Sequence, residues 1–516
     1  MSEAFQQLFE HERRLTMITC DLTDVNFKTV DIPLVTLTPP ASPPTSQENL
    51  GLEDVDLEDI NRVSTCCTDC IILPRADGGR DAWLFLAACF VFEALVWGNF
   101  SLSLYRQIVS NARTGFPFSF GIFQSYYTTH APFAGNHNGI AAIGTCSSGV
   151  MYLFAPVSLH ILEAWPGVRR LSSIVGLFIA ATALILSSFS TQIWHLIITQ
   201  GVMYAIGGSL LYSPTMFYLD EWFEKKKGLA FGVMWSGVGA SGLVFPFVLK
   251  ALLDVWGFAY TLRVWAVILV FLCAPLIYFI KPRIPFTADT PIKKPSYVFR
   301  FKPTYLLLQA SNILESFGFF IPAIYLPTYA ASMHLSPQIG VLLLALLNLF
   351  SVIGAIALGF FCDKMHVSHV IAISTFGSTF SVLCFWGTAD EVTRLIVFAM
   401  CYGAFAGGYS ALWAGMMKEV QRVKGCEDVG MGVLMGVFAA GRGIGAVSSG
   451  PLSEVLLNIP IGGVAGFKSG YGALIVFTGA SAFAGGIGWA VTRKMRGRVE
   501  GDANDAASMT GGCCSH

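Results

Sequence analysis

The chain has 516 residues, of which 54% are hydrophobic and only 13% charged, and its formal net charge is −1. Soluble globular proteins usually carry about 25% charged residues, so this composition excludes an ordinary soluble domain. No basic surplus indicates a nucleic-acid partner, and no spacing of the 13 cysteines or of the histidines resembles a zinc site. We expect no nucleic acid, metal or other cofactor, and the composition instead indicates a protein that is embedded in the lipid bilayer.

Residues 1–76 differ from the rest of the chain. They contain 13 acidic against 5 basic residues, together with a proline-rich stretch at 38–44. A segment of this composition buries too little apolar surface to become ordered. We predict a mostly disordered, acidic cytosolic tail, with a docking or degradation segment as the alternative.

From Ala82 onward, apolar runs of about 17–29 residues alternate with short polar connections, and about 20 residues cross a hydrocarbon core. Lipid offers the backbone no hydrogen-bond partners, so runs of this length must be helices. The expected fold is an all-α membrane protein with twelve transmembrane helices, at 82–127 (interrupted), 139–162, 171–189, 193–218, 228–249, 259–280, 305–330, 337–361, 370–388, 394–416, 431–457 and 470–491.

Residues 99–115 interrupt the first of these runs, and their removal leaves one unbroken span of 29 residues. Their retention places Arg106 and Arg113 beside or within a membrane helix, at a cost of about 2.5 kcal/mol or more each at its centre. The codons at the two ends of the segment and within it can encode the signals of an intron that is removed in frame. We interpret 99–115 as a retained intron. The alternative is a re-entrant or outer loop with a glycosylation site at Asn99, and the sequence of the mature transcript separates the two.

The two halves of the chain echo each other at an offset of about 200 residues, and duplicated six-helix halves around a midplane site are a transporter architecture. We therefore expect two pseudo-symmetric bundles at 77–280 and 305–492, joined by a cytosolic loop at 281–304 and followed by a cytosolic tail at 493–516. Small residues at every fourth position in spans four, five, ten and eleven predict close helix packing. These stripes are Gly201, Ala205, Ser209 and Ser213; Gly228, Gly232, Ser236 and Ala240; Gly403, Gly407, Ala411 and Gly415; and Gly432, Gly436 and Ala440.

Lysine and arginine are sorted between the connections. If the N-terminus lies inside, the inner connections and the C-terminal tail hold 19 of them and the outer connections hold 4, the interruption in the first span being set aside. This asymmetry predicts that both termini lie in the cytosol. We expect an integral, multi-pass protein of the plasma membrane or of a vacuolar or other organellar membrane.

Several motifs carry a family resemblance. The first span opens with Asp-Gly-Gly at 77–79 and continues with Ser-Phe-Gly-Ile-Phe at 119–123. A longer motif that includes Asp-Glu-Trp-Phe-Glu-Lys-Lys-Lys-Gly occupies 218–232, and Phe-Phe-Ile-Pro opens a third at 319–329. With these motifs, the region 77–495 resembles the monocarboxylate transporter family of the major facilitator superfamily, in its fungal branch.

The resemblance implies alternating-access transport of a small organic solute, such as a carboxylate-bearing metabolite, with spans one and seven lining the path. Three positions depart from the animal members of the family. Phe118 stands where they carry a lysine, and Asn348 and Val352 stand where they carry an aspartate and an arginine. The resemblance therefore implies transport but not proton-coupled lactate transport, and Phe118 and Asn348 become candidate substrate or coupling positions.

The superfamily's Gly-x3-Asp-Arg/Lys element has a counterpart at the inner end of span eight, and a looser version lies between spans two and three. Charges at such junctions can bind neighbouring helices in one conformation and release them in the other. Simple positive-inside anchoring is the alternative. The candidate gating residues are Asp363, Lys364, Glu163, Arg169 and Arg170.

Three ionisable residues lie inside predicted spans, where a charge is costly and usually faces a partner or a wet cavity. Arg442 in span eleven is a candidate to hold an anionic substrate through charge-assisted hydrogen bonds. Glu93 in span one and Glu315 in span seven are candidates to bind a coupling proton. The alternative is a structural ion pair that locks helices together.

The leading interpretation is a transporter of a small molecule that performs no covalent chemistry. A nutrient-sensing receptor on a transporter scaffold is the second, and the long N-terminal segment is its only support. A membrane-embedded enzyme ranks last, because no intramembrane cluster of histidine and aspartate and no metal-ligand spacing accompanies the spans.

Overall fold

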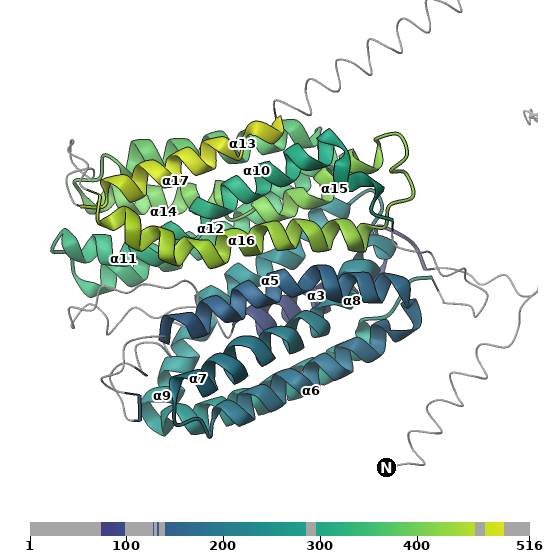
Figure 1. Cartoon of the computed structure of the whole chain (residues 1–516), viewed down its shortest axis with the longest axis horizontal. Helices are drawn as coiled ribbons and strands as arrows, with labels where there is room; N and C mark the ends of the chain where they lie inside the picture. The colour runs from purple at the N-terminus through teal and green to yellow at the C-terminus, as the bar shows by residue number, and fades with distance from the viewer. Residues whose placement is uncertain are drawn as a thin grey trace, which may run out of the picture. The chain divides into compact units, whose positions relative to one another are not determined.

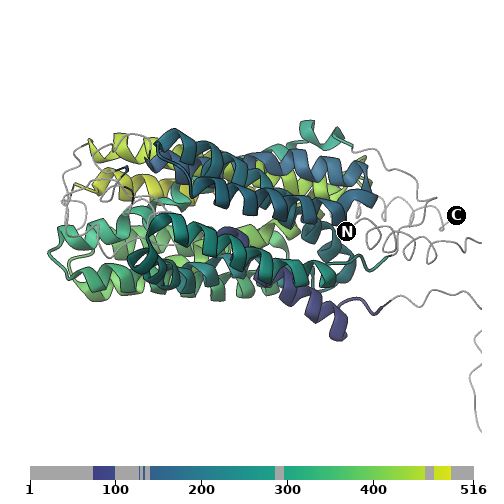
Figure 2. The same ribbon diagram turned by 90° about the horizontal axis from the view of Figure 1, so that it is seen from below.

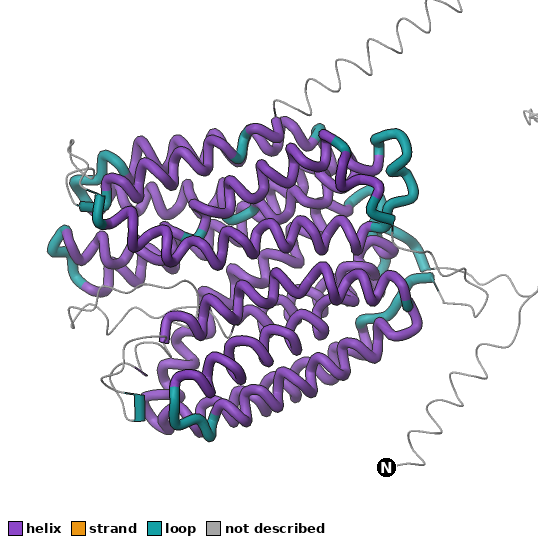
Figure 3. Tube along the Cα trace, in the orientation of Figure 1, coloured by secondary structure: helices purple, strands orange, loops and turns teal. Residues whose placement is uncertain are grey.

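The computed structural model describes residues 74–98, 127, 132–133, 140–284, 296–459 and 470–489. Within them, all regular secondary structure is helical (Figure 3). Residues 1–73 of the predicted tail, the segment 99–115, Phe118 and the C-terminal tail lie outside the described residues.

In the N-terminal half, successive helices form the first six spans. They are α3 (Arg80–Gly98), α5 (Ile140–Ala164), α6 (Arg169–Ser187), a fourth span built from α7 (Ile193–Leu196), the π-helical η2 (Ile197–Met203) and α8 (Tyr204–Trp222), and α9 (Lys227–Phe279). α9 contains two spans, because Gly257 has a φ of 70° that breaks the helix and that glycine adopts without a steric penalty.

The C-terminal half repeats this plan after a short helical turn, η3 (Val298–Phe301). Its spans are α10 (Pro303–Phe319) with α11 (Ile321–Ser332), α12 (Pro337–Lys364), α13 (Val367–Phe380) with η4 (Ser381–Trp386), α14 (Val392–Ala406) with η5 (Tyr409–Leu412) and α15 (Trp413–Gln421), α16 (Met431–Leu457), and α17 (Gly472–Ala484).

Ten helical stretches among the described residues are long and apolar enough to cross a membrane. α3 and α5 supply the two remaining spans, and the predicted fold of twelve helices in two bundles is confirmed. Large apolar side chains such as Phe178 and Phe271 are 70% and 77% exposed on the outside of the helices. Extensive apolar exposure is unusual for a soluble monomer and suits contact with lipid. The protein is therefore an integral, multi-pass membrane protein.

The two bundles lie side by side, α3 to α9 in one and α10 to α17 in the other, with their helices roughly parallel (Figures 1 and 2). They meet along two pairs of helices, α9 against α12 and α5 against α16. The duplication explains this pairing, because α5 and α12 are the second helices of their bundles, and α16 and the first part of α9 are the fifth.

Glycines make both contacts possible. A Cβ atom at Gly228 or Gly232 would collide with the α12 backbone at Gly359 or Ala355, and one at Gly436 would press on Pro156 of α5. The small-residue stripes of spans five and eleven therefore pack one bundle against the other, as helices do in lipid when small residues let their backbones approach.

Candidate ligand cavity and its closures

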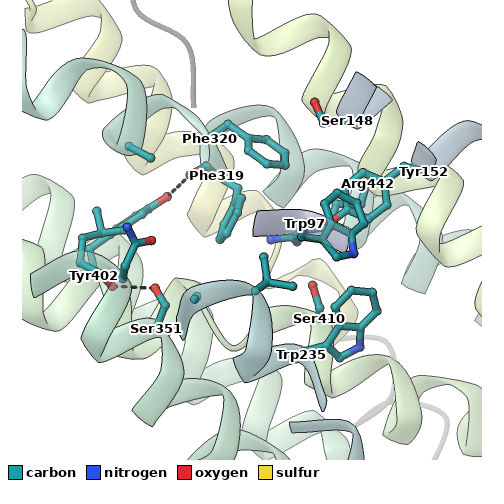
Figure 4. Close-up of a pocket in the computed structure, with 16 residues that line it drawn as sticks. Trp97, Ser148, Tyr152, Trp235, Phe319, Phe320, Ser351, Tyr402, Ser410 and Arg442 are labelled. Atoms are coloured by element: carbon teal, nitrogen blue, oxygen red, sulfur yellow. Dashed lines mark hydrogen bonds between the residues drawn. The ribbon is translucent and has the colours of Figure 1, made fainter. Parts of the chain in front are cut away.

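A cavity lies between the two bundles, and side chains from both of them line it (Figure 4). Three of its lining residues lie at two interruptions of helices in the C-terminal bundle. Phe320 separates α10 from α11, and Gly407 and Ser410 lie where span ten changes from α14 to η5. The lining residues are Trp97, Ser148, Tyr152, Trp235, Val238, Gly239, Phe319, Phe320, Ala323, Leu347, Asn348, Ser351, Tyr402, Gly407, Ser410 and Arg442.

Aromatic rings dominate the walls of this cavity. On one side, Trp97 of α3 and Tyr152 of α5 pack with their ring centroids 4.7 Å apart. Trp235 of α9 packs edge-on against Trp413 of α15, with centroids 5.6 Å apart. The remaining rings are Phe319, Phe320 and Tyr402. Such a lining favours a ligand with a large apolar or planar surface.

Arg442 is the one charged side chain among the residues that line the cavity. Its Nη1 donates to Oε2 of Glu315 at 2.9 Å, and the two side chains are 2% and 5% exposed. The guanidinium carbon also lies 3.9 Å from the ring centroid of Phe319, so a cation–π contact supports the same group. Glu315 is not among the lining residues. The structure thus joins two predicted candidates into one buried ion pair, of which only Arg442 faces the cavity.

Asn348 adds an uncharged polar group to the wall, and its Nδ2 lies 3.5 Å from the carbonyl oxygen of Gly242 in α9. Three hydroxyl groups, from Ser148, Ser351 and Ser410, complete the polar part of the lining. Asn348 therefore stands both at the cavity and at the contact of α12 with α9. This position agrees with its prediction as a substrate or coupling residue without testing it.

Glu93 lies elsewhere. It is fully buried in α3, and it is not among the residues that line the cavity. The α9 backbone at Gly237 packs against it so closely that an added Cβ there would lie 3.2 Å from Cβ of Glu93. The structure therefore separates Glu93 from the pair formed by Arg442 and Glu315.

A carboxylate closes the α9–α12 contact at the end of the bundles that carries Lys225, Lys226, Arg283 and Lys418, which we call the basic end. The side chain of Asp363, at the end of α12, accepts hydrogen bonds from the backbone N–H groups of Gly228 at 2.7 Å and Leu229 at 2.8 Å. These groups belong to the first turn of α9, where N–H groups lack partners within the helix and the helix dipole attracts negative charge.

A second carboxylate does the same for the α5–α16 contact. Oε2 of Glu163, near the end of α5, accepts from the backbone N–H of Val433 at 2.9 Å, in the first turn of α16. We call these two contacts the Asp363 latch and the Glu163 latch. They are related by the duplication of the fold, and both join one bundle to the other at the basic end.

The other predicted gating residues are Arg169, Arg170 and Lys364, and Arg169 interacts electrostatically with Glu163 of the second latch. Arg169 stays within the N-terminal bundle, where its Nε donates to the carbonyl of Leu162 at 3.0 Å and its Nη1 lies 3.4 Å from Glu221. Arg170 and Lys364 are exposed. Their positions suit anchoring at the membrane surface, which was the alternative interpretation for this cluster.

Asp77 explains why two separate motifs occur together in the sequence. Its carboxylate accepts hydrogen bonds from the backbone N–H groups of Glu224, Lys225 and Lys226, at 3.0, 2.9 and 2.7 Å. Burial alone would raise the pKa of Asp77, but these three bonds outweigh burial and hold that pKa below its usual value. The Asp-Gly-Gly segment at 77–79 is thus fixed to the long motif at 218–232, directly before the first turn of α9.

The sequence of this chain is similar to those of known proteins. Residues 86–449 match the sequence model of the Major Facilitator Superfamily. The chain is 26% identical to the "MFS transporter asaE" of Aspergillus flavus, over 79% of this chain and 86% of that one. It is 26% identical to the "Agnestins efflux protein AgnL12" of Paecilomyces divaricatus, over 74% and 84%, and 25% identical to the "Fujikurins efflux protein" of Gibberella fujikuroi, over 79% and 82%.

Solved structures share the fold at low identity. A bacterial homologue of the iron transporter ferroportin superposes with a TM-score of 0.57 at 13% identity, over 80% of this chain and 98% of that one. The human organic anion transporter MFSD10 superposes with a TM-score of 0.57 at 12% identity, over 80% and 100%. These likenesses concern the arrangement of the helices.

Proposed function

Because the chain belongs to the Major Facilitator Superfamily, we propose that it carries a small organic anion across the membrane through the cavity between its bundles. The observation that carries this proposal is the position of Arg442. A guanidinium buried in the membrane requires a partner, and here it has both Glu315 behind it and the open cavity before it.

The substrate we propose is mostly apolar, with one carboxylate or similar acidic group. The anionic group would receive a hydrogen bond from the N–H groups of Arg442 that Glu315 leaves for the cavity, and Asn348 would orient it. The rings of Trp97, Trp235 and Phe320 would cover its apolar part. Glu315 balances the charge of Arg442, so the cavity has no surplus positive charge with which to hold a dianion tightly.

We propose export as the direction of transport. Two of the relatives are described as efflux proteins for named metabolites, agnestins and fujikurins. A cavity lined mostly by aromatic rings suits a largely apolar acid better than it suits a two- or three-carbon acid such as lactate, which the departures at Asn348 and Val352 had already made a poor candidate.

The two latches supply the conformational step of this proposal. In the conformation described, they hold the bundles together at the basic end, which the charge asymmetry assigns to the cytosol. Carboxylates at helix N-termini contribute about 0.3–1 kcal/mol each and up to about 2 kcal/mol when partly buried. Both latches must break for the basic end to open, and stabilisation of this size biases the equilibrium without locking it.

Transport by inverted membrane vesicles tests the proposal. Vesicles that contain the full chain would be offered a panel of labelled aromatic acids, together with their methyl esters and short aliphatic acids as matched controls. We expect accumulation of at least one aromatic acid above that in vesicles without the protein, and little of its ester. Binding without accumulation would favour the nutrient-sensing receptor, and accumulation of esters and acids alike would contradict the role of Arg442.

A further inference from the structure

The indole N–H of Trp235 is a hydrogen-bond donor without a partner at the wall of the cavity. The side chain is 7% exposed, and its Nε1 has no hydrogen-bond partner among the described residues. The ring packs against Trp413, but a contact between aromatic rings replaces a hydrogen bond of this donor only weakly. A buried N–H group that stays unsatisfied costs free energy, so its presence calls for an explanation.

The other indoles in a similar state do not offer their donor to the cavity. Trp265 and Trp386 also carry a buried Nε1 without a partner in the described part of the chain, but neither lines the cavity. Trp97 does line it, and its indole interacts with Glu93 within α3. Trp235 therefore combines two properties, because its donor is unused and the residue belongs to the wall that a ligand would contact.

Ser410 offers a second unused group. The hydroxyl groups of Ser148 and Ser351, the other two serines of the lining, donate to carbonyl groups one turn earlier in their own helices, at 3.0 and 2.7 Å. Ser410 lies in η5, where span ten departs from α-helical geometry, and its hydroxyl has no hydrogen-bond partner among the described residues. The interruption of the helix thus leaves this hydroxyl group for the cavity.

These two groups come from opposite bundles and lie close together. The helix α9, which carries Trp235, contacts η5, which carries Ser410. Trp413, whose ring centroid is 5.6 Å from that of Trp235, follows Ser410 by one helical turn in the same span. Figure 4 shows Trp235 and Ser410 next to each other on one side of the cavity, with Arg442 above them in that view. The unused donor and the unused hydroxyl group therefore form one polar site, which is distinct from Arg442.

The chemistry of the two groups restricts what they can hold. An indole N–H can only donate, whereas a hydroxyl group both donates and accepts. A carbonyl oxygen can accept from both, and a hydroxyl substituent can accept from Trp235 and donate to Ser410. An ammonium group has no lone pair for the indole, and no charged side chain besides Arg442 lines the cavity to balance a second carboxylate. The site therefore selects for an uncharged oxygen.

We propose that Trp235 and Ser410 form a second subsite of the cavity, which binds a carbonyl or hydroxyl oxygen of the substrate while Arg442 binds its acidic group. The inference rests on the proposed transport function and narrows its substrate class to aromatic acids that carry a further oxygen substituent. Because the two groups belong to different bundles, an oxygen held by both favours the conformation in which those bundles are in contact.

Binding of two matched acids to the purified full chain tests the subsite. The acids are para-benzoylbenzoic acid and para-benzylbenzoic acid, which differ at one position, where the first has a carbonyl group and the second a methylene group. We expect the affinity for the ketone, relative to that for the methylene compound, to fall by about tenfold in Trp235→Phe, which keeps an aromatic ring but lacks the N–H. Ser410→Ala should lower the same ratio, and it serves as the second variant if Trp235→Phe does not fold.

The matched control is Trp265→Phe, because it removes a buried, unused indole N–H from a residue that does not line the cavity. Its ratio of affinities should equal that of the wild type. The infrared band of the bound ketone gives a direct readout. A hydrogen bond weakens the C=O bond, so the band should lie at lower frequency in the wild type than in Trp235→Phe.

The possible failures separate the subsite from the proposed function. Equal ratios and equal band positions in the wild type, Trp235→Phe and Ser410→Ala would overturn the inference. A chain that transports other acids of the vesicle panel but does not bind the ketone would overturn it as well. A wild-type chain that transports none of these acids would instead overturn the proposed function.

Discussion

The two bundles share one arrangement of helices but differ at the cavity. At the basic end they are equivalent, because Asp363 and Glu163 each hold the first turn of a helix in the opposite bundle. At the cavity they are not. The N-terminal bundle presents Trp97, Tyr152 and Trp235 from positions within the helices α3, α5 and α9, whereas the C-terminal bundle presents Arg442 together with the interruptions at Phe320 and at Gly407.

This difference suggests a division of labour between the bundles. Breaks in a helix free backbone groups and let side chains turn into a cavity, and membrane helices tolerate them where they face protein or water. We infer that the C-terminal bundle binds the anionic group and the N-terminal bundle binds the apolar part of the substrate. The latches are shared equally because both bundles must release together.

The largest expected effect is at Arg442. Removing one member of a buried, hydrogen-bonded charge pair costs about 2–5 kcal/mol, so Arg442→Ala should lower transport of an acidic substrate by about 30-fold or more. The measurement is initial rate in vesicles that contain equal amounts of protein. Because the variant leaves Glu315 unpaired, Arg442→Gln combined with Glu315→Gln provides a second variant without a buried charge. Normal transport by both would reduce the ion pair to a packing element.

A large effect is also expected where the bundles touch. Gly232→Val would drive its side chain into the α12 backbone at Ala355, and overpacking of this kind costs about 1–3 kcal/mol. We expect the closed conformation to lose population by about 5- to 150-fold, which cysteine accessibility at the basic end would measure. Gly167→Ala is the matched control, because no atom lies within 4 Å of a Cβ at that position. Equal accessibility in the two variants would argue against the contact.

Substitutions at the two latches should have intermediate effects on transport. Their comparison shows how much each of the two contacts between the bundles contributes. Asp363→Asn should slow the maximal rate by about 2- to 30-fold with little change in apparent substrate affinity. Glu163→Gln should do the same, since Glu163 accepts a backbone hydrogen bond in the first turn of α16 as Asp363 does in the first turn of α9. The double variant should show the product of the two effects if the latches act independently. An unchanged maximal rate in either single variant would leave that residue with an anchoring role.

The fold was predictable from the sequence because lipid fixes the length of a span. The run expected at 139–162 is α5 at Ile140–Ala164, and the run at 431–457 is α16 at Met431–Leu457. Arg442 and Glu315 could each be predicted as candidates, because a charged residue inside an apolar run is easily recognised. Their ion pair could not be predicted, because the two residues are 127 positions apart on different helices and the local sequence does not indicate which helix faces are in contact.

The aromatic walls of the cavity were missed for a related reason. In a soluble helix a buried ring stands out by its alternation with polar residues, but in a membrane helix both faces are apolar. Nothing in the sequence distinguishes Trp235, which lines the cavity, from Phe271, which is exposed on the outside. The equivalence of Glu163 and Asp363 was also hidden, because the motif around Glu163 is the looser of the two.

The smallest expected effect is at Asp77, which supports the Asp363 latch from within the N-terminal bundle. Asp77 orders the segment 224–226, and Asp363 binds the two residues that follow at 228 and 229. Because backbone hydrogen bonds hold the pKa of Asp77 below its unfolded value despite partial burial, its contribution to stability is present above that unfolded pKa, about 3.9. It is lost as the pH falls through the lower, folded pKa. Asp77→Asn should therefore lower the thermal unfolding midpoint slightly at pH 7, and the difference from wild type should shrink in strongly acidic buffer. If the difference instead stays constant from neutral to strongly acidic pH, the effect of the substitution does not come from the charge that binds the start of α9.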